Sequence, residues 1–306
     1  MSEKVTPRVD LAFKKLFGVE ENKDLLISLI NAIVSEEDQV ADITLLNPYN
    51  PQNFRDDKLS ILDIKAQSII GKRYNIEIQI TPDADYDKRA LYYWAKLYTE
   101  QLQKSEGYAS LNKAIGIHIL NFFSVPGSKK YHNVFHLKEK DTGIHYFKNM
   151  ELHTIELSKF EAKLKEDGDE REALLRAIQT SLGRWVAFLT HHDRLTNVPL
   201  NDPQVERALG VIDEMNLNTQ ERDLYEGHLK WLWTEAAALK TVAQDSFEEG
   251  KAEGLEKGTA IGLEKGIKTG GQLKALEIAK AMLNRGMDIQ AVSDLTGLSI
   301  EMIQGS

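Results

Sequence analysis

Residues 60–80 read SILDIKAQSIIGKRYNIEIQI, and their two alternating runs predict a β-hairpin. Successive side chains of a strand point to opposite faces. Asp63 therefore shares a polar face with Lys65 in the first run, and Glu77 shares one with Gln79 in the second. A hairpin folded about Ile70 places Asp63 directly opposite Glu77.

Two opposed carboxylates destabilise a strand pair by several tenths of a kcal/mol, roughly, unless water or a cation separates them. With the main-chain carbonyl of Ile78, Asp63 and Glu77 are hard oxygen ligands of the kind that Mg²⁺ accepts. Such a site suits phosphodiester hydrolysis, with Gln79 to orient the attacking water and Lys65 to balance negative charge. The alternative is an ordinary solvated face, because antiparallel strands often have one polar side.

Four separated segments stand out along the chain: DLAFKKLFG (10–18), DDKLSILDIKAQSIIGKRYNIEIQI (56–80), RALYYWAKLYTEQLQKSEGYASL (89–111) and AIGIHILNF (114–122). In this order they resemble the PD-(D/E)XK nuclease family transposases, also called Rpn-type recombination-promoting nucleases. The resemblance covers about residues 8–125 at the level of motifs, and the glycine-periodic tail is similar to tails in the same family.

The resemblance implies an α/β fold with a restriction-endonuclease-like core, in which helices flank a mixed sheet, and Mg²⁺-dependent cleavage of DNA. Mn²⁺ and Ca²⁺ are alternative ions. Asp63 takes the place of the PD aspartate, and Glu77 and Gln79 take the (D/E)XK element. Leu62 replaces the usual proline, which is not a ligand.

Gln79 stands where the wider superfamily has lysine, and a neutral amide cannot supply an ammonium charge. Lys65, or Arg89 and Lys96 on the following helix, are the candidates to supply it. The resemblance also suggests Asp10 as a third acidic participant from the first helix. The competing role for Asp10 is helix N-capping.

Charge is unevenly distributed along the chain of 306 residues. Residues 1–157 carry 20 Lys and Arg against 22 Asp and Glu, so most of the net charge of −9 belongs to residues 158–306. Paired cations in the first part are candidates for phosphate contacts or ordinary solubility features: Lys14 with Lys15, Lys72 with Arg73, Lys88 with Arg89, and Lys129 with Lys130.

The sequence has no cysteine, and therefore no disulfide or thiolate metal site. It shows no apolar leader and no apolar run of membrane-spanning length. A cytoplasmic protein that does not enter a membrane is expected.

Four regions are expected: a nuclease-like domain (1–157), a helical domain (158–248), a glycine-periodic helix or linker (249–271) and a small helical tail (272–306), which together give an all-α C-terminal extension. Helices are predicted over residues 10–17, 23–34, 86–104, 169–190, 203–215 and 220–247. Strands are predicted over residues 41–46, 60–66, 74–80, 113–122, 133–137, 144–147 and 153–157.

Glycine recurs every four residues, at 250, 254, 258, 262, 266 and 270. Each glycine costs a helix about 1 kcal/mol relative to alanine, so a compensating contact is needed if this segment is helical. A ridge without side chains allows a second helix to approach closely. We expect a homo-oligomer, such as a dimer, through residues 249–271; a flexible linker is the alternative.

The tail is predicted to form three short helices, with Gly286 and Gly297 as left-handed stops and Asp288 and Ser299 as caps. Its last helix contains no Arg or Lys. A packing module is therefore favoured over a helix-turn-helix that reads DNA.

The function expected from these observations is that of a Mg²⁺-dependent DNA endonuclease associated with recombination or mobile elements. Arg89, Lys96, Lys72 and Arg73 are its candidate DNA contacts. The alternative is a weak or inactive DNA-binding scaffold that assembles through the glycine-periodic helix.

Overall fold

The computed structural model describes residues 5–49, 63–166, 169–195 and 198–304. These form two compact units, residues 1–236 and 237–306. The helix α8 (Thr219–Asn284) runs through the boundary between them. No described helix combines the length and the hydropathy needed to cross a lipid bilayer.

The first unit is built on a six-stranded mixed sheet with the order β1-β2-β3-β4-β6-β5. The strand β3 is antiparallel to β2 and parallel to β4, and β4 is parallel to β6. The strands are β1 (Ile43–Leu45), β2 (Ile64–Ser68), β3 (Arg73–Gln79), β4 (Ala114–Leu120), β5 (His132–Phe135) and β6 (Met150–Glu156). This arrangement confirms the expected mixed sheet.

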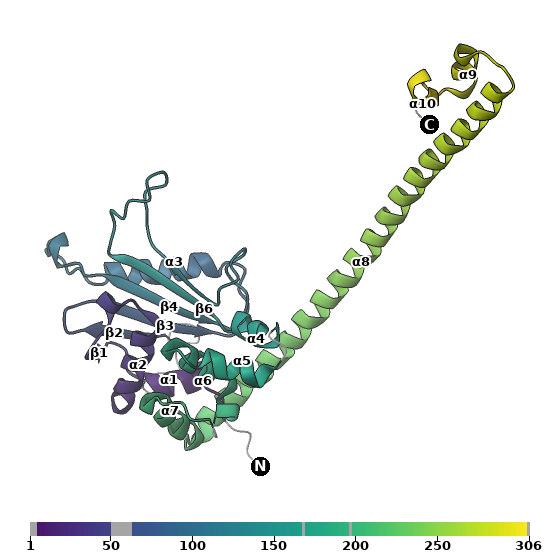
Figure 1. Ribbon diagram of the computed structural model, residues 1–306. Helices are drawn as coiled ribbons and strands as arrows, with labels where there is room; N and C mark the ends of the chain where they lie inside the picture. Colours follow the sequence, from purple (N-terminus) through teal and green to yellow (C-terminus); the bar gives the residue numbers. More distant parts are fainter. Residues whose placement is uncertain (1–4, 50–62, 167–168, 196–197, 305–306) are drawn as a thin grey trace. The chain divides into compact units, whose positions relative to one another are not determined.

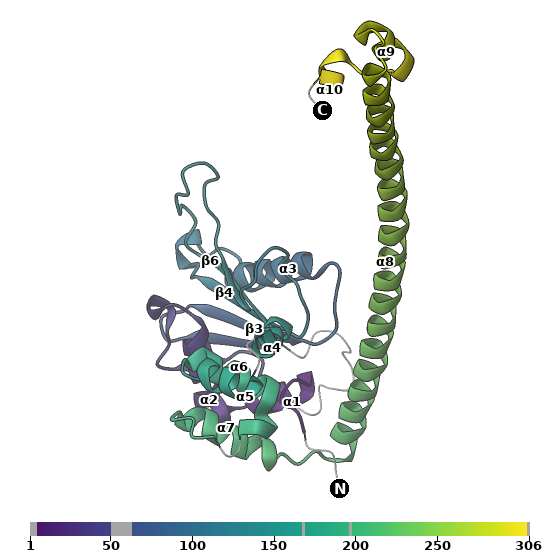
Figure 2. The same cartoon turned by 45° about the vertical axis from the view of Figure 1, so that its right-hand side comes forward.

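Helices cover both faces of this sheet (Figures 1 and 2). The helix α3 (Tyr86–Thr99) packs against β3 and β4 on one face, while α1 (Asp10–Phe17) and α2 (Lys23–Ile33) lie on the other. The remaining helices of this unit are α4 (Leu157–Glu166), α5 (Glu170–Ala177), α6 (Ser181–Leu195) and α7 (Pro203–Asp213), with short 3-10 turns η1 (Glu20–Asn22), η2 (Glu36–Asp38) and η4 (Tyr108–Ser110).

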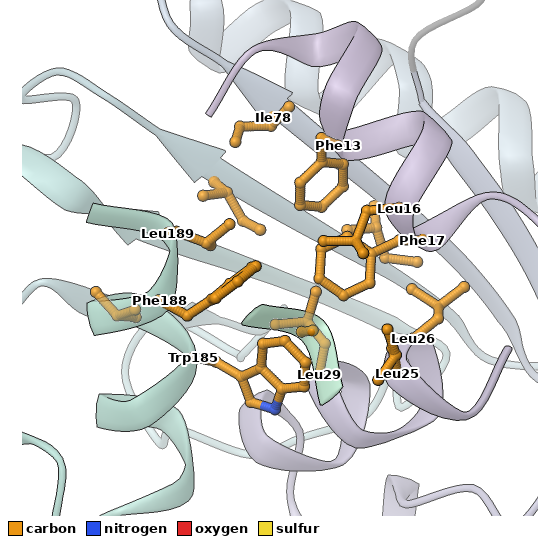
Figure 3. Packing of buried hydrophobic residues seen from close by; sticks show 14 of the residues in the cluster. Phe13, Leu16, Phe17, Leu25, Leu26, Leu29, Ile78, Trp185, Phe188 and Leu189 are labelled. Atoms are coloured by element: carbon orange, nitrogen blue, oxygen red, sulfur yellow. The ribbon is translucent and has the colours of Figure 1, made fainter. Parts of the chain in front are cut away.

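The main core lies between the sheet and the α1, α2 and α6 helices (Figure 3). Its aromatic rings form a continuous series, with centroid separations of 4.7 Å for Phe13 and Phe17, 5.6 Å for Phe17 and Trp185, and 5.7 Å for Trp185 and Phe188. Such pairs contribute about 0.5–1.5 kcal/mol each beyond the burial of their area. Helices from the expected helical domain of residues 158–248 thus share the core of the sheet and do not build a separate one.

Two predicted elements differ from the structure. Residues 144–147 are not a strand but part of the connection between β5 and β6, which turns at Gly143 (φ +70°) and leaves Ile144 and Tyr146 exposed. The predicted helix over 169–190 is two helices, because Thr180 accepts a hydrogen bond from the Gly183 N–H (3.0 Å) and begins α6 anew. The start of the predicted first hairpin strand, residues 60–62, lies outside the described residues.

A single α-helix continues through all six periodic glycines. A Cβ atom added at any of them would lie in open space, so packing among the described residues does not account for the period. In the second unit, the end of α8 packs against α9 (Ile289–Thr296) and α10 (Ile300–Gln304).

The predicted caps of the tail are present. Gly286 and Gly297 have positive φ angles of 85° and 72°, and Asp288 accepts hydrogen bonds from the Gln290 and Ala291 N–H groups. The first of the three expected short helices is the end of α8.

Candidate active site

The predicted hairpin register is confirmed. Ile64 pairs with Ile76 and Ala66 with Tyr74. Asp63 immediately precedes β2, so the continued register sets it opposite Glu77. The turn between the strands contains Gly71, whose φ of +87° is readily adopted only by glycine.

The polar face of this hairpin is only partly solvated. Glu77 is only 5% exposed and Asn75 only 1%, because α3 covers this side of the sheet, whereas Asp63, Lys65 and Gln79 are half-buried. Ile76 and Ile78 belong to the core on the other face, where Ile78 lies near Phe13 (Figure 3). An ordinary solvated face therefore does not describe Glu77, and burial is the main influence on its chemistry.

Glu77 has one oxygen that is bound and one that is not. Its Oε1 accepts a hydrogen bond from Arg89 Nη2 at 2.7 Å, whereas its Oε2 has no hydrogen-bond partner among the described residues. Burial raises the pKa of Glu77 to about 7; Arg89 opposes this shift and Asp63 adds to it. The carboxyl group is thus poised between its neutral and charged forms near neutral pH.

His118 faces Glu77 from β4, with Nδ1 3.8 Å from Glu77 Oε2. Its Nδ1 also lies 2.9 Å from the Tyr86 hydroxyl, and burial lowers the pKa of His118 to about 4. The imidazole is therefore neutral. The sequence analysis missed this residue, although a histidine within the apolar run AIGIHIL was a signal that could have identified it.

Asp10 brings a third carboxyl group to the site. It is 7% exposed, and its pKa is raised to about 7, mainly by burial and also by the charge of Glu77. Val9 holds the N-cap position of α1, and no side chain hydrogen-bonds there as a cap. Asp10 is the first residue inside the helix, and a backbone hydrogen bond at the start of α1 acts to lower its pKa. Helix capping and participation in the site both stay predictions for Asp10. We refer to Asp10, Asp63 and Glu77 as the carboxylate site.

Asp63 is held through its backbone. Lys14 Nζ donates hydrogen bonds to the main-chain carbonyls of Asp63 and Asn47, and the Asn47 side chain donates to the same Asp63 carbonyl at 3.1 Å. Asn47 also accepts from the Lys65 N–H at 2.6 Å. Burial raises the pKa of the Asp63 carboxyl group, against the opposing charges of Lys14 and Lys65.

Lys14 is the main site residue whose environment the sequence did not reveal. It was a candidate surface cation with Lys15, but it is 1% exposed, and burial lowers its pKa to about 8. It lies four residues after Asp10, so both project from one side of α1. Lys15 instead pairs with Glu221 of α8 at 2.7 Å.

Two of the predicted cations lie near the carboxylate site and share a partner. Lys65 Nζ is 3.0 Å from Glu100 Oε2, and Lys96 Nζ is 3.8 Å from Glu100 Oε1. Arg89 binds Glu77 directly, as described above. Gln79, the last residue of β3, donates to the Thr81 carbonyl at 3.3 Å.

Lys72 and Arg73 lie at the opposite end of β3. Lys72 Nζ is 2.8 Å from Asp38 Oδ1, whereas Arg73 begins the strand and is half-buried. The structure therefore does not bring this pair together with Glu77 and Gln79.

The carboxylate site contains the oxygen ligands that a hard divalent cation prefers. It offers carboxylate oxygens, and Glu77 Oε2 is buried without a hydrogen bond from any described residue. The charge of Asp63 raises the pKa of Glu77, and the charge of Glu77 raises the pKa of Asp10. Within the described ranges, no group of three or more His, Cys, Asp or Glu residues is arranged to hold a metal ion. The ligand set of Asp63 and Glu77 with the Ile78 carbonyl stays a prediction.

Comparison with known proteins gives two family matches. Residues 7–242 match the model described as PD-(D/E)XK nuclease family transposase. Residues 272–304 match the model described as Rpn/YhgA-like nuclease family, C-terminal HTH domain, which favours the helix-turn-helix alternative for the tail. No curated protein and no solved structure gives a match.

Proposed function

The chain belongs to the PD-(D/E)XK nuclease family transposases, and from this membership we propose that it is a metal-dependent endonuclease that hydrolyses phosphodiester bonds in DNA. The observation that carries the proposal is the unpartnered Glu77 Oε2, buried opposite Asp63 and within the electrostatic influence of Asp10. Strongly perturbed carboxyl groups that are buried together are characteristic of functional sites.

Asp63, Glu77 and the main-chain carbonyl of Ile78 would hold the ion, for which Mg²⁺ is the best candidate and Mn²⁺ and Ca²⁺ are alternatives. When bound, a divalent ion supplies charge neutralisation and a more acidic water molecule. The ligands must be deprotonated to bind it, so the pKa of about 7 for Glu77 couples its ionisation to metal binding.

The protein's own groups orient the reaction. Arg89 fixes one Glu77 oxygen and leaves the other, 3.8 Å from His118 Nδ1, without a hydrogen bond from any described residue. Asp10, with a pKa of about 7, is suited to accept a proton at its carboxylate from the attacking water. The Gln79 amide can donate to a phosphate oxygen, and Lys65 is the cation for the developing charge.

The C-terminal helix-turn-helix match supports DNA as the partner, and the transposase description of the matched family supports a role in recombination or mobile-element biology. We also propose that the protein acts in the cytoplasm. The second candidate function is a weakly active or inactive DNA-binding scaffold. The observation that favours it is Gln79, which supplies no positive charge at the position of the usual lysine.

Cleavage of supercoiled plasmid separates the two functions. We expect nicking by the wild type with Mg²⁺, no nicking with EDTA, and none by Asp63→Ala or Glu77→Ala. Glu172→Ala, at an exposed carboxylate of α5, is the matched control and should cleave as the wild type does. DNA binding without metal-dependent cleavage would favour the scaffold.

We also propose that two copies of the chain associate through residues 249–271. The apolar side chains next to the glycine ridge are exposed, with Leu255 at 72%, Leu263 at 65% and Ile267 at 68%. A second helix would cover them and offset the cost of the glycines. Sedimentation velocity should show a dimer that the double variant Gly258→Leu and Gly262→Leu dissociates and that Lys268→Leu preserves; a wild-type monomer would refute the proposal.

A further inference from the structure

A cavity of about 1050 Å³ lies between residues 123–132 and α4. Its described lining contains four lysines, Lys129, Lys130, Lys159 and Lys163, and one carboxylate, Glu166. In a chain with a net charge of −9, this is a local concentration of positive charge. It indicates an anionic ligand.

The first part of the cavity wall is firmly anchored. Glu156 is fully buried and accepts hydrogen bonds from the N–H groups of Ser124 (2.7 Å) and Val125 (3.3 Å). Lys159 donates to the Val125 carbonyl and to Glu156, both at 2.8 Å. Lys159 therefore holds the cavity wall in place through Val125 and Glu156, whereas the other three lysines form no ion pair with any described residue.

Phe123 stands at this anchored corner with 68% of its surface exposed. The preceding residue, Phe122, is buried, and its ring packs edge-on against Tyr86 at 5.6 Å. Tyr86 in turn contacts His118, which faces Glu77. An exposed phenylalanine held in a fixed position beside lysines forms a stacking platform of the kind that binds the bases of single strands.

The cavity wall begins at the end of the sheet where Glu77 lies, namely the carboxyl ends of β3 and β4. The strands β3 and β4 are parallel, and Gln79 is in register with Leu120. The Asn121 N–H donates to the Gln79 carbonyl at 2.9 Å, and the chain then enters the cavity wall at Phe123. A strand with its scissile phosphate at Glu77 could therefore continue into the cavity.

We propose that this cavity binds a single-stranded segment of the DNA substrate that flanks the scissile phosphate. Phe123 stacks on a base, and Lys129, Lys130 and Lys163 contact the phosphates. The inference rests on the proposed nuclease function, because it takes the carboxylate site as the place of cleavage.

The test measures binding of a fluorescent twelve-nucleotide single strand, and of the same sequence as a duplex, to the full chain carrying Asp63→Asn. Phe123→Ala should weaken single-strand binding about 10-fold, the loss expected for one stacked base. The double variant Lys129→Gln and Lys130→Gln should reduce the slope of log K against log salt by roughly 1.4. Matched controls are Tyr108→Ala, whose ring is 84% exposed at η4, and the double variant Lys138→Gln and Lys140→Gln on the β5–β6 connection.

Equal losses in the test and control variants would overturn the proposal, since they would reflect only overall charge and exposed aromatic area. A loss confined to duplex binding would overturn it too. Nicking of plasmid by the chain with an intact Asp63, measured in parallel, reports on the nuclease function separately. If the protein cleaves plasmid but Phe123→Ala does not weaken single-strand binding, only the proposed role of the cavity is refuted. If Phe123→Ala weakens binding but the protein does not cleave, only the proposed nuclease function is refuted.

Discussion

Two polar clusters of the first unit have opposite electrostatics. In the carboxylate site, Glu77 lies on the α3 side of the sheet and Asp10 begins α1, and burial raises the pKa of both groups to about 7. The second, which we call the ion-pair cluster, consists of Asp38, Lys72, Lys113, Glu151 and His153. The β4–β6 register sets Glu151 beside Ile115, whose side chain points away from α3.

Every carboxylate oxygen of the ion-pair cluster has a partner. Lys113 Nζ bridges Asp38 at 2.5 Å and Glu151 at 2.8 Å, Lys72 binds the other Asp38 oxygen, and His153 binds the other Glu151 oxygen at 2.7 Å. Burial acts to raise the pKa of Glu151, but hydrogen bonds from His153 and Lys113 lower it to about 2.

Glu77 and Glu151 are 5% and 3% exposed, so burial alone does not distinguish them. The number of partners does. A fully satisfied buried cluster stabilises one arrangement of the chain, whereas a carboxylate left with an unpartnered oxygen retains binding capacity for something else. The comparison therefore predicts activity effects at the carboxylate site and stability effects at the ion-pair cluster.

The largest expected effect is on cleavage. Glu77→Gln should lower the rate of plasmid nicking by at least roughly 10³-fold, because loss of a metal ligand removes several kcal/mol of transition-state stabilisation. Glu151→Gln, which removes the same charge from the ion-pair cluster, should cleave within a few-fold of wild type at a temperature where it is folded. Equal losses of nicking activity in Glu77→Gln and Glu151→Gln would contradict the proposed difference between the two clusters.

The next largest effect is on stability, where Glu151→Gln should cause a greater loss than Glu77→Gln. Glu151→Gln should lower the free energy of unfolding by about 3 kcal/mol, since it leaves the half-buried Lys113 and the buried His153 without the carboxylate that both bind. Glu77→Gln should change it by less than about 1 kcal/mol, because it removes a buried charge that has few partners. Urea denaturation of both variants measures the difference, and a larger loss for Glu77→Gln would contradict it.

Lys14 and Lys113 differ in the groups that they bind. Lys113 binds carboxylates, whereas Lys14 binds main-chain carbonyls and so positions Asp63. Lys14→Met should weaken the apparent Mg²⁺ affinity in cleavage about 10- to 100-fold, the usual cost of losing a group that supports a metal ligand.

Lys15→Met is the matched control for this measurement, because Lys15 binds Glu221 and does not contact Asp63. It should leave the Mg²⁺ dependence unchanged. A Lys14→Met enzyme with reduced rate but unaltered Mg²⁺ dependence would show that Lys14 serves only the fold.

The features that the sequence predicted are those set by local pattern. The hairpin register follows from alternation around Ile70, and the end of α1 follows from Gly18, whose N–H bonds to the Lys14 carbonyl. The glycine and aspartate caps of the tail are equally local. The family resemblance supplied Asp10, which periodicity alone would not have separated from a helix cap.

The features that escaped prediction depend on contacts distant along the chain. Lys14 is adjacent to Lys15 and reads as part of a solvated pair until Asn47 and Asp63 are known to surround it. The ion-pair cluster joins η2, β4 and β6, whose parallel register no local pattern encodes. Burial by α3 likewise could not be read from the hairpin, although it sets the pKa of Glu77.

The last expected effect is in the pH dependence of stability. The pKa of Glu77 is raised from 4.5 to about 7, so the folded state takes up this proton before the unfolded state does. The contribution of Glu77 to stability therefore rises as pH falls from 7 to about 4.5. Relative to Glu77→Gln, the wild type should gain roughly 2–3 kcal/mol across this window, at about 1.4 kcal/mol per pKa unit.

Glu151 has the opposite shift, to a pKa of about 2, so its contribution is constant above about pH 4.5 and is lost only as pH falls from there toward 2. The difference in unfolding free energy between wild type and Glu151→Gln should accordingly be flat from pH 7 to 5. Because His118 and His132 titrate in both proteins of each pair, comparing each variant with wild type removes their contribution. If the difference in unfolding free energy from wild type changed with pH in the same direction for both variants, the two clusters would not differ in the way proposed.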